Sequence, residues 1–168
     1  MEQIRTILAL DCATKTGWAV YQRYYSDGGF LTQDYFSGMQ DFSKRRGESN
    51  GIMFLRFRKW LHEMKDKFDG SIDLVIYERA HHRGGAPTEI GYGLTGIVQA
   101  FAAEIGAEYD AVHTGTLKKF ATGKGNAGKP DMIAYFKREI GKEPADDNEA
   151  DAYALLRYAI DQYVVDTK

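Results

Sequence analysis

The sequence predicts an α/β domain with a mixed five-stranded sheet flanked by helices, in which three antiparallel strands come first and parallel strands follow. Three observations indicate this fold class. The apolar run "TILALD" (residues 6–11) stops at a carboxylate, two more strand-like segments flank the turn "SDGG", and strand-like and helical segments then alternate. The length of 168 residues suits one domain with one substantial core, expected to span residues 1–168.

The first three strands are predicted from continuous or β-rich apolar sequence. "TILALD" shows little alternation and ends on a polar residue, which is typical of a strand buried on both faces. "GWAVYQRYY" (17–25) and "FLTQDYFSG" (30–38) are expected to pair as a hairpin, because Asp27-Gly28 between them is a strong turn signal.

The rest of the chain alternates helical and strand patterns. A helix is expected over 52–68, where apolar residues recur at near-helical spacing: Ile52, Leu55, Trp60, Leu61, Met64 and Phe68. "SIDLVIYE" (71–78) and "AEYDAVH" (107–113) are predicted as the fourth and fifth strands, with a helix over 87–105 between them. Short helices are expected at 116–121 and 130–140, and a last helix at 148–163. Strand–helix–strand units of this kind add parallel strands to a sheet.

Composition excludes several classes of protein. Apolar residues make up 43% of the chain, which indicates a folded domain, and no apolar run approaches the roughly 20 residues of a membrane span. We expect no signal peptide, and the single cysteine, Cys12, excludes an internal disulfide and suits a reducing cytoplasm. A net charge of −2 argues against a uniformly basic nucleic-acid binder but leaves room for local basic patches.

Acidic side chains occupy three positions that the predicted fold would bring together. Asp11 ends the first strand and Glu78 the fourth, and the carboxyl ends of strands are where α/β sheets bind ligands. In the last helix, Asp147, Asn148 and Asp151 lie at i, i+1 and i+4 and can share one face. Two further acids there, Asp146 and Glu149, are expected to point toward solvent.

Each acid alone has a structural alternative: Asp147 could be a helix N-cap, and Asp11 could hold an Asx turn. The combination favours a metal site, since several carboxylate oxygens from separate elements are what a hard cation such as Mg²⁺ requires.

Four segments resemble the RuvC family of Holliday-junction resolvases, in particular its phage-type members: "ILALDCATKTGWAV", "VIYERAHHRGG", "TLKKFATGKGNAGKPDM" and "DDNEADAYALL". The resemblance covers about Ile7 to Ala159 and implies a ribonuclease H-like fold. It further implies a crossover junction endodeoxyribonuclease, a Mg²⁺-dependent enzyme that cleaves four-way (Holliday) junctions and other branched DNA by two-metal phosphodiester hydrolysis. Such an enzyme would act in the cytoplasm, that of a bacterial host if a phage encodes it.

The same resemblance assigns the catalytic residues. It places Asp11, Glu78 and Asp151 as metal ligands. The family has a further acid three residues before the last one, where this chain has Asn148, so we expect the neighbouring Asp147 to be the fourth acid, with Asn148 as the alternative, neutral ligand. Asp11 would bridge two Mg²⁺ ions, for which Mn²⁺ would substitute. Glu78 would complete one metal site, and Asp151 with Asp147 would complete the other.

Basic segments are the expected DNA contacts. "KKFATGKGNAGK" (118–129) holds four lysines and no acid. The resemblance makes Lys118 and Lys129 phosphate contacts, with Lys119 and Lys124 in the same patch. The loop after Glu78 is expected to enter the junction, where a histidine would stack on a base; its basic residues are Arg79, His81, His82 and Arg83. The basic stretches "SKRRG" (43–47) and "RFRKW" (56–60) are expected to be solvated surface.

The helix over 87–105 is expected to form a homodimer. Its large apolar stripe should cover the sheet: Ile90, Leu94, Ile97, Phe101 and Ile105. A second stripe is small and admits close approach of another backbone, either a second protomer or a neighbouring helix of the same chain: Gly93, Gly96, Ala100 and Ala103. The resemblance favours the second protomer, and no membrane partner is expected.

Other functions remain open at this point. An RNA-processing nuclease of the same fold would share the acidic residues, and a non-catalytic junction-binding module would share the basic ones. "DCATKTGW" also resembles the phosphate-binding turn of actin-like ATPases and sugar kinases, but those proteins need two such domains.

Overall fold

The computed structural model describes residues 4–82 and 84–164 and contains one five-stranded sheet of order β3-β2-β1-β4-β5. The strands are β1 (Thr6–Asp11), β2 (Lys15–Tyr25), β3 (Leu31–Asp41), β4 (Leu74–Glu78) and β5 (Glu108–Val112). The β1–β2 and β2–β3 pairs are antiparallel, whereas the β1–β4 and β4–β5 pairs are parallel. The predicted mixed sheet is therefore confirmed.

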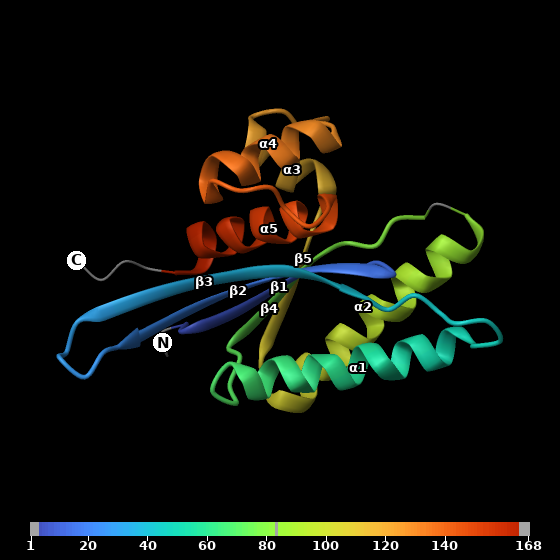
Figure 1. The fold of residues 1–168 in the computed structure, drawn as a ribbon, viewed down its shortest axis with the longest axis horizontal. Helices are drawn as coiled ribbons and strands as arrows, with labels where there is room; N and C mark the ends of the chain where they lie inside the picture. The colour runs from blue at the N-terminus through green and yellow to red at the C-terminus, as the bar shows by residue number, and fades with distance from the viewer. Residues whose placement is uncertain (1–3, 83, 165–168) are drawn as a thin grey trace.

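Helices cover both faces of this sheet (Figure 1). On one face lie α1 (Asn50–Lys67) and α2 (Gly85–Ile105). On the other lie α3 (Thr114–Thr122), α4 (Lys129–Ile140) and α5 (Asp147–Tyr163). Every predicted helix is present, with ends that differ by a few residues. None of the helices in the described ranges has the length and hydrophobicity needed to cross a bilayer.

The central strand β1 separates two hydrophobic cores. Ile7 and Ala9 belong to the core under α3, α4 and α5, and Leu8 and Leu10 belong to the core under α1 and α2. All four side chains are fully buried. Burial on both faces explains why the sequence of β1 is a continuous apolar run without alternation.

The helices α1 and α2 differ in how well their buried residues match the apolar positions of the sequence pattern. In α2, Leu94 and Phe101 are buried in the sheet-facing core as expected. In α1, the predicted helix is present, but Ile52 and Leu55 lie outside its buried face, since they are 41% and 64% exposed. The buried positions of α1 are Met53, Phe57, Leu61 and Met64, at the spacing of one helix face.

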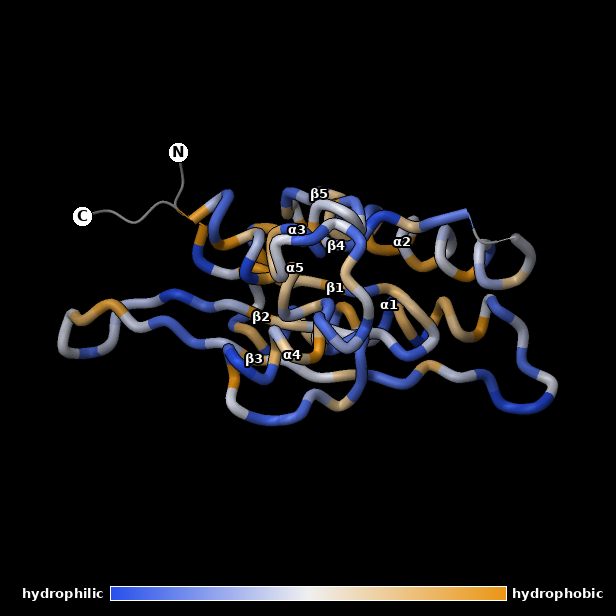
Figure 2. Tube along the Cα trace, turned by 90° about the horizontal axis from the view of Figure 1, so that it is seen from above, coloured by the Kyte–Doolittle hydropathy of each residue, from blue (hydrophilic) through white to orange (hydrophobic). Residues whose placement is uncertain are grey.

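The β2–β3 hairpin extends beyond the helical layers (Figure 1). Its last pair is Tyr25 with Leu31, and the predicted turn closes it, with the Ser26 N–H donating to the Phe30 carbonyl oxygen at 2.9 Å. Gly29 supplies the left-handed backbone of this turn, with φ of 77°. Figure 2 shows hydrophobic residues at the tip, where Tyr25 and Phe30 are exposed.

The start of α5 is fixed directly onto the sheet. A side chain at Gly17 of β2 would place its Cβ 1.8 Å from the backbone oxygen of Asn148, so only glycine admits this contact. The Asn148 amide donates to the Lys15 carbonyl oxygen at 2.7 Å. These contacts set the position from which Asp151, one turn later, reaches the end of β1.

Two expectations for the same helix start are wrong. Glu149 does not point toward solvent; it is 4% exposed and accepts a hydrogen bond from the Ser37 hydroxyl of β3 at 2.8 Å. Asp146, and not Asp147, is the N-cap, and its carboxylate accepts the Glu149 N–H at 2.9 Å. Because β3 supplies the hydroxyl, the buried position of Glu149 depends on a partner far away in the sequence.

We predict that Gly17→Ala displaces the start of α5 and lowers the free energy of unfolding by about 1–3 kcal/mol or more, since the backbone of Asn148 cannot move aside as a flexible side chain would. Denaturant unfolding followed by circular dichroism measures this. The control is Gly51→Ala in α1, where the nearest atom would be at 3.5 Å. The control should unfold as the wild type does or at higher denaturant; equal curves for both variants would contradict the prediction.

Candidate metal centre

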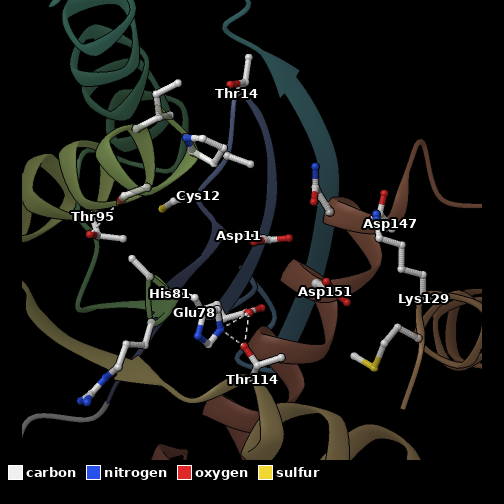
Figure 3. Close-up of a pocket in the computed structure, with 18 of the residues that line it drawn as sticks. Asp11, Cys12, Thr14, Glu78, His81, Thr95, Thr114, Lys129, Asp147 and Asp151 are labelled. Carbon is white, nitrogen blue, oxygen red and sulfur yellow. Dashed lines mark hydrogen bonds and ion pairs between the residues drawn. The ribbon is translucent and has the colours of Figure 1, made fainter. Parts of the chain in front are cut away.

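A cavity of about 440 Å³ opens at the edge of the sheet where β1 and β4 end. It lies between the first turns of α2 and α5 (Figure 3). Its floor carries Asp11 and Glu78, and the α5 side carries Asp147, Asn148 and Asp151. The α2 side is mainly apolar, with Pro87, Ile90 and Gly91 among others. The strand-end acids and the acids of the last helix therefore meet in one place, as predicted.

Three carboxylates form a tight cluster in this cavity. One oxygen each of Asp11, Glu78 and Asp151 lies within 4.8 Å of the others, and all three side chains are partly buried. Asp11 ends β1 and Glu78 ends the parallel neighbour β4, so the sheet fixes two of them. The contact of α5 with β2 brings in the third.

Two neighbouring side chains, Thr114 and His81, contact the Glu78 carboxylate. The Thr114 hydroxyl donates to Glu78 Oε1 at 2.5 Å, and the His81 Nε2 lies 3.4 Å from the same oxygen. His81 and Thr114 also hydrogen-bond each other (Figure 3). Both interactions use Oε1, so they restrict rotation of the Glu78 carboxylate. Sequence reasoning missed Thr114, although its place directly after β5, at the same edge of the sheet, is a usable signal.

The two candidates for the fourth ligand have different surroundings. The Asp147 carboxylate forms an ion pair with the Lys129 ammonium, with Nζ and Oδ2 2.7 Å apart. The Asn148 amide nitrogen is used by the Lys15 carbonyl oxygen. Asp147 is not one of the acids that cluster within 4.8 Å, although both Asp147 and Asn148 line the cavity.

Crowding of the acids changes their protonation. Burial raises the pKa of Asp11 well above its ordinary value, and the charges of Glu78 and Asp151 raise it further. Burial, with repulsion from Glu78, raises the pKa of Asp151 to about 7, while Lys118 and Lys129 act against this shift. Without a bound cation, the cluster therefore holds protons near neutral pH.

This donor set fits a hard divalent cation. The ligands are carboxylate oxygens alone, which suits Mg²⁺ or Mn²⁺ and disfavours a thiophilic metal. A cation would also remove the repulsion that raises the pKa values of Asp11 and Asp151. Cys12 follows Asp11 and lines the cavity, but burial raises the pKa of its thiol well above the ordinary value, so it stays protonated.

The predicted DNA-contacting residues fall into three groups. Arg79, His81, Lys118 and Lys129 line the cavity. Lys119, Lys124 and His82 are exposed outside its lining. Arg83 lies outside the described residues. The basic side chains around the acidic cluster are thus supplied mainly by the β4–α2 loop and by α3 and α4.

The raised pKa of Asp151 predicts an unusual pH dependence of stability. The pKa of this carboxyl is about 7 in the folded chain and near its ordinary value of 3.8 in the unfolded chain, so the folded state binds more protons between these two pH values. The free energy of unfolding of the metal-free protein should therefore fall as pH rises from about 4 to 7. Asp151→Asn should remove part of this loss and stabilise the metal-free chain at pH 8 by roughly 1–3 kcal/mol.

Urea unfolding in EDTA at pH 5 and pH 8 measures the effect. Asp161→Asn, at an exposed position of the same helix, is the control and should keep the wild-type pH dependence. A wild-type chain that is more stable at pH 8 than at pH 5 would contradict the prediction.

No protein-family model matches the chain, and no curated protein matches its sequence. Among solved structures, it is similar to Thermus thermophilus RuvC, with a TM-score of 0.71 and 19% identity over 94% of this chain and 97% of that one. It is also similar to T. thermophilus RuvC in complex with Holliday junction substrate, with a TM-score of 0.70 and 18% identity over 90% of each chain.

A third similar structure is the yeast mitochondrial Holliday junction resolvase Ydc2, with a TM-score of 0.56 and 11% identity over 91% of this chain and 76% of that one. Sequence identities this low establish the fold alone. The expected ribonuclease H-like architecture, a mixed five-stranded sheet with helices on both faces, is confirmed.

Proposed function

We propose that this chain is a metal-dependent, structure-selective endonuclease that cleaves four-way DNA junctions and other branched DNA. The observation that carries the proposal is the cluster of Asp11, Glu78 and Asp151 at the sheet edge of a fold similar to RuvC. One of the similar structures is a RuvC in complex with Holliday junction substrate. The lysines and arginine beside the cluster suit a substrate that carries phosphates.

The proposed cofactor is a pair of Mg²⁺ ions, for which Mn²⁺ would substitute. Asp11, Glu78 and Asp151 would hold them, with Asp147 as the fourth acid. When bound, such ions supply a hydroxide at neutral pH and counter-charge for the leaving 3′ oxygen. We assign Asp147 in preference to Asn148, because Asp147 is an acid whose charge already acts on Asp11.

The protein's own groups have distinct tasks in this mechanism. Asp11 is fixed by β1 between the other two acids, so it would contact whatever cation the cluster holds. Thr114 and His81 orient Glu78. Lys118 and Lys129 lie on the α3–α4 side of the cavity, where their charges would bind the phosphates that flank the scissile bond.

The direct test is Mg²⁺-dependent cleavage of a synthetic four-way junction, compared with linear duplex, flap and RNA substrates. Asp11→Asn, Glu78→Gln and Asp151→Asn should each reduce cleavage by on the order of 10³-fold or more, because each removes an ionised ligand. Binding to the junction should be kept or tightened, since each change removes negative charge near the phosphates.

Asp161→Asn serves as the control, with wild-type cleavage expected. Junction cleavage by Asp11→Asn at the wild-type rate would refute the site. Preference for RNA over every branched DNA would replace the proposal by an RNA-processing nuclease, and metal-independent binding without cleavage would leave a junction-binding module.

We further propose that the active form is a homodimer built on α2. The small stripe of this helix serves two purposes: Gly93 is covered by Phe54 of α1, whereas a side chain at Gly96 would meet no atom within 4 Å. Ala100 and Ala103 are exposed, and the nearby Tyr92 is 53% exposed. A two-fold pair of active sites would match the two strands cut in a four-way junction.

Gly96→Leu and Ala100→Leu should therefore give folded monomers that nick one strand of the junction. Multi-angle light scattering gives the mass, and a supercoiled cruciform plasmid distinguishes nicking from paired cuts. Leu55→Ser changes an exposed apolar residue of α1 and serves as the control that stays dimeric. A wild-type chain that is monomeric both alone and on a junction would end this part of the proposal.

A further inference from the structure

The loop between β3 and α1 begins at the rim of the metal centre. β3 ends at Asp41, which pairs with Lys15 at the start of β2. The next residue, Phe42, donates its N–H to the Thr14 carbonyl oxygen at 2.8 Å, and Thr14 lines the cavity. Residues 43–47, "SKRRG", therefore leave the sheet at the edge where the acids gather (Figure 3 shows Thr14 beside them).

The backbone of this loop is fixed. Glu48 accepts the Arg45 backbone N–H at 2.7 Å and the Arg56 guanidinium at 2.8 Å, and Asp41 accepts the Ser43 N–H at 2.8 Å. Gly47 adopts a left-handed conformation with φ of 83°. Arg56 is the principal partner of Glu48 and lowers its pKa to about 2, so this carboxylate is a structural anchor of the loop.

The side chains of the loop are basic and exposed. Lys44, Arg45 and Arg46 are exposed, and within 4–82 and 84–164 no ion pair involves any of them. Segment 43–47 contains no acid. The second basic stretch, "RFRKW", differs: Arg56 pairs with Glu48, and Arg58 pairs with Glu104 of α2. Lys44 donates a hydrogen bond to Asn50 Oδ1 at 2.7 Å, so among the described residues the side chains of the loop that take part in no salt bridge or side-chain hydrogen bond are Arg45 and Arg46.

The loop and the lysines of α3 and α4 belong to different faces of the sheet. The helices α3 and α4 cover one face, whereas the loop leads into α1 on the other (Figure 1). Figure 2 shows the β3–α1 connection as a hydrophilic stretch at one end of the molecule. A backbone with its scissile phosphate at the acids would thus meet positive charge on both sides.

We infer that residues 43–47 form a second phosphate-binding surface, which contacts the DNA backbone on the α1 side of the cut site through Arg45 and Arg46. The inference rests on the proposed nuclease function. Rigid anchoring by Glu48 reduces the conformational freedom that the loop would otherwise lose on binding. Exposed guanidinium groups bind phosphate oxygens well, because two parallel N–H groups can donate to one phosphate.

The test measures binding of a fluorescent four-way junction over a series of salt concentrations, in Ca²⁺ and in an Asp11→Asn background that does not cut. Arg45→Gln combined with Arg46→Gln should reduce the slope of log affinity against log salt by about 1.8, since each lost phosphate contact contributes about 0.9. Lys59→Gln combined with Lys65→Gln removes the same charge from the body of α1 and should leave the slope unchanged.

Arg46→Gln alone keeps the test decisive if the double variant does not fold, because none of the loop's backbone hydrogen bonds among the described residues uses Arg46. It should lower the slope by about 0.9, and Arg46→Lys should restore it. Equal slopes for the loop and α1 variants would overturn the inference while leaving the nuclease intact. A wild-type chain that binds neither branched nor linear DNA would overturn both.

Discussion

Concentration of negative charge at one edge of the sheet is the constraint on which the rest of this structure depends. Asp11, Glu78 and Asp151 lie within 4.8 Å of one another, and burial with mutual repulsion drives the pKa of Asp151 to about 7. Such an arrangement is unfavourable by itself, so the surrounding fold must hold the acids together. It does so with two neighbouring parallel strands, a glycine that admits α5, and a capped helix start anchored by Asn148 and Glu149.

The helices on the two faces of the sheet contribute different groups to the site. The α3–α5 layer contributes Asp151, Asp147 and the lysines that partly compensate the acids, and the Lys129–Asp147 ion pair joins these two groups directly. The α1–α2 layer contributes the apolar wall of the cavity and a helix surface with open glycine and alanine positions. Within the cavity, the α3–α5 layer thus supplies charged side chains, and the α1–α2 layer supplies the apolar wall.

The sequence was sufficient for the features that depend on local pattern. Asp11 and Glu78 could be placed at strand ends because β1 and β4 are continuous apolar runs that stop at an acid, and Asp151 because i, i+4 spacing puts it on one helix face with Asp147. The sequence was insufficient where the position of a side chain depends on a residue far away in the chain. The burial of Glu149 depends on Ser37, the orientation of Glu78 on Thr114, and the exposure of Leu55 on how α1 meets the sheet.

The anchoring of α5 on β2 has a consequence for how the molecule is assembled. The hairpin of β2 and β3 is local in sequence and can form early, whereas the contact between Gly17 and Asn148 joins residues that are far apart in the sequence and needs a long loop to close. Until α5 docks, Asp151 is remote from Asp11, and the repulsion between them is absent. Pairing of β1 with β4 brings Asp11 and Glu78 together, and docking of α5 then completes the acidic cluster with Asp151.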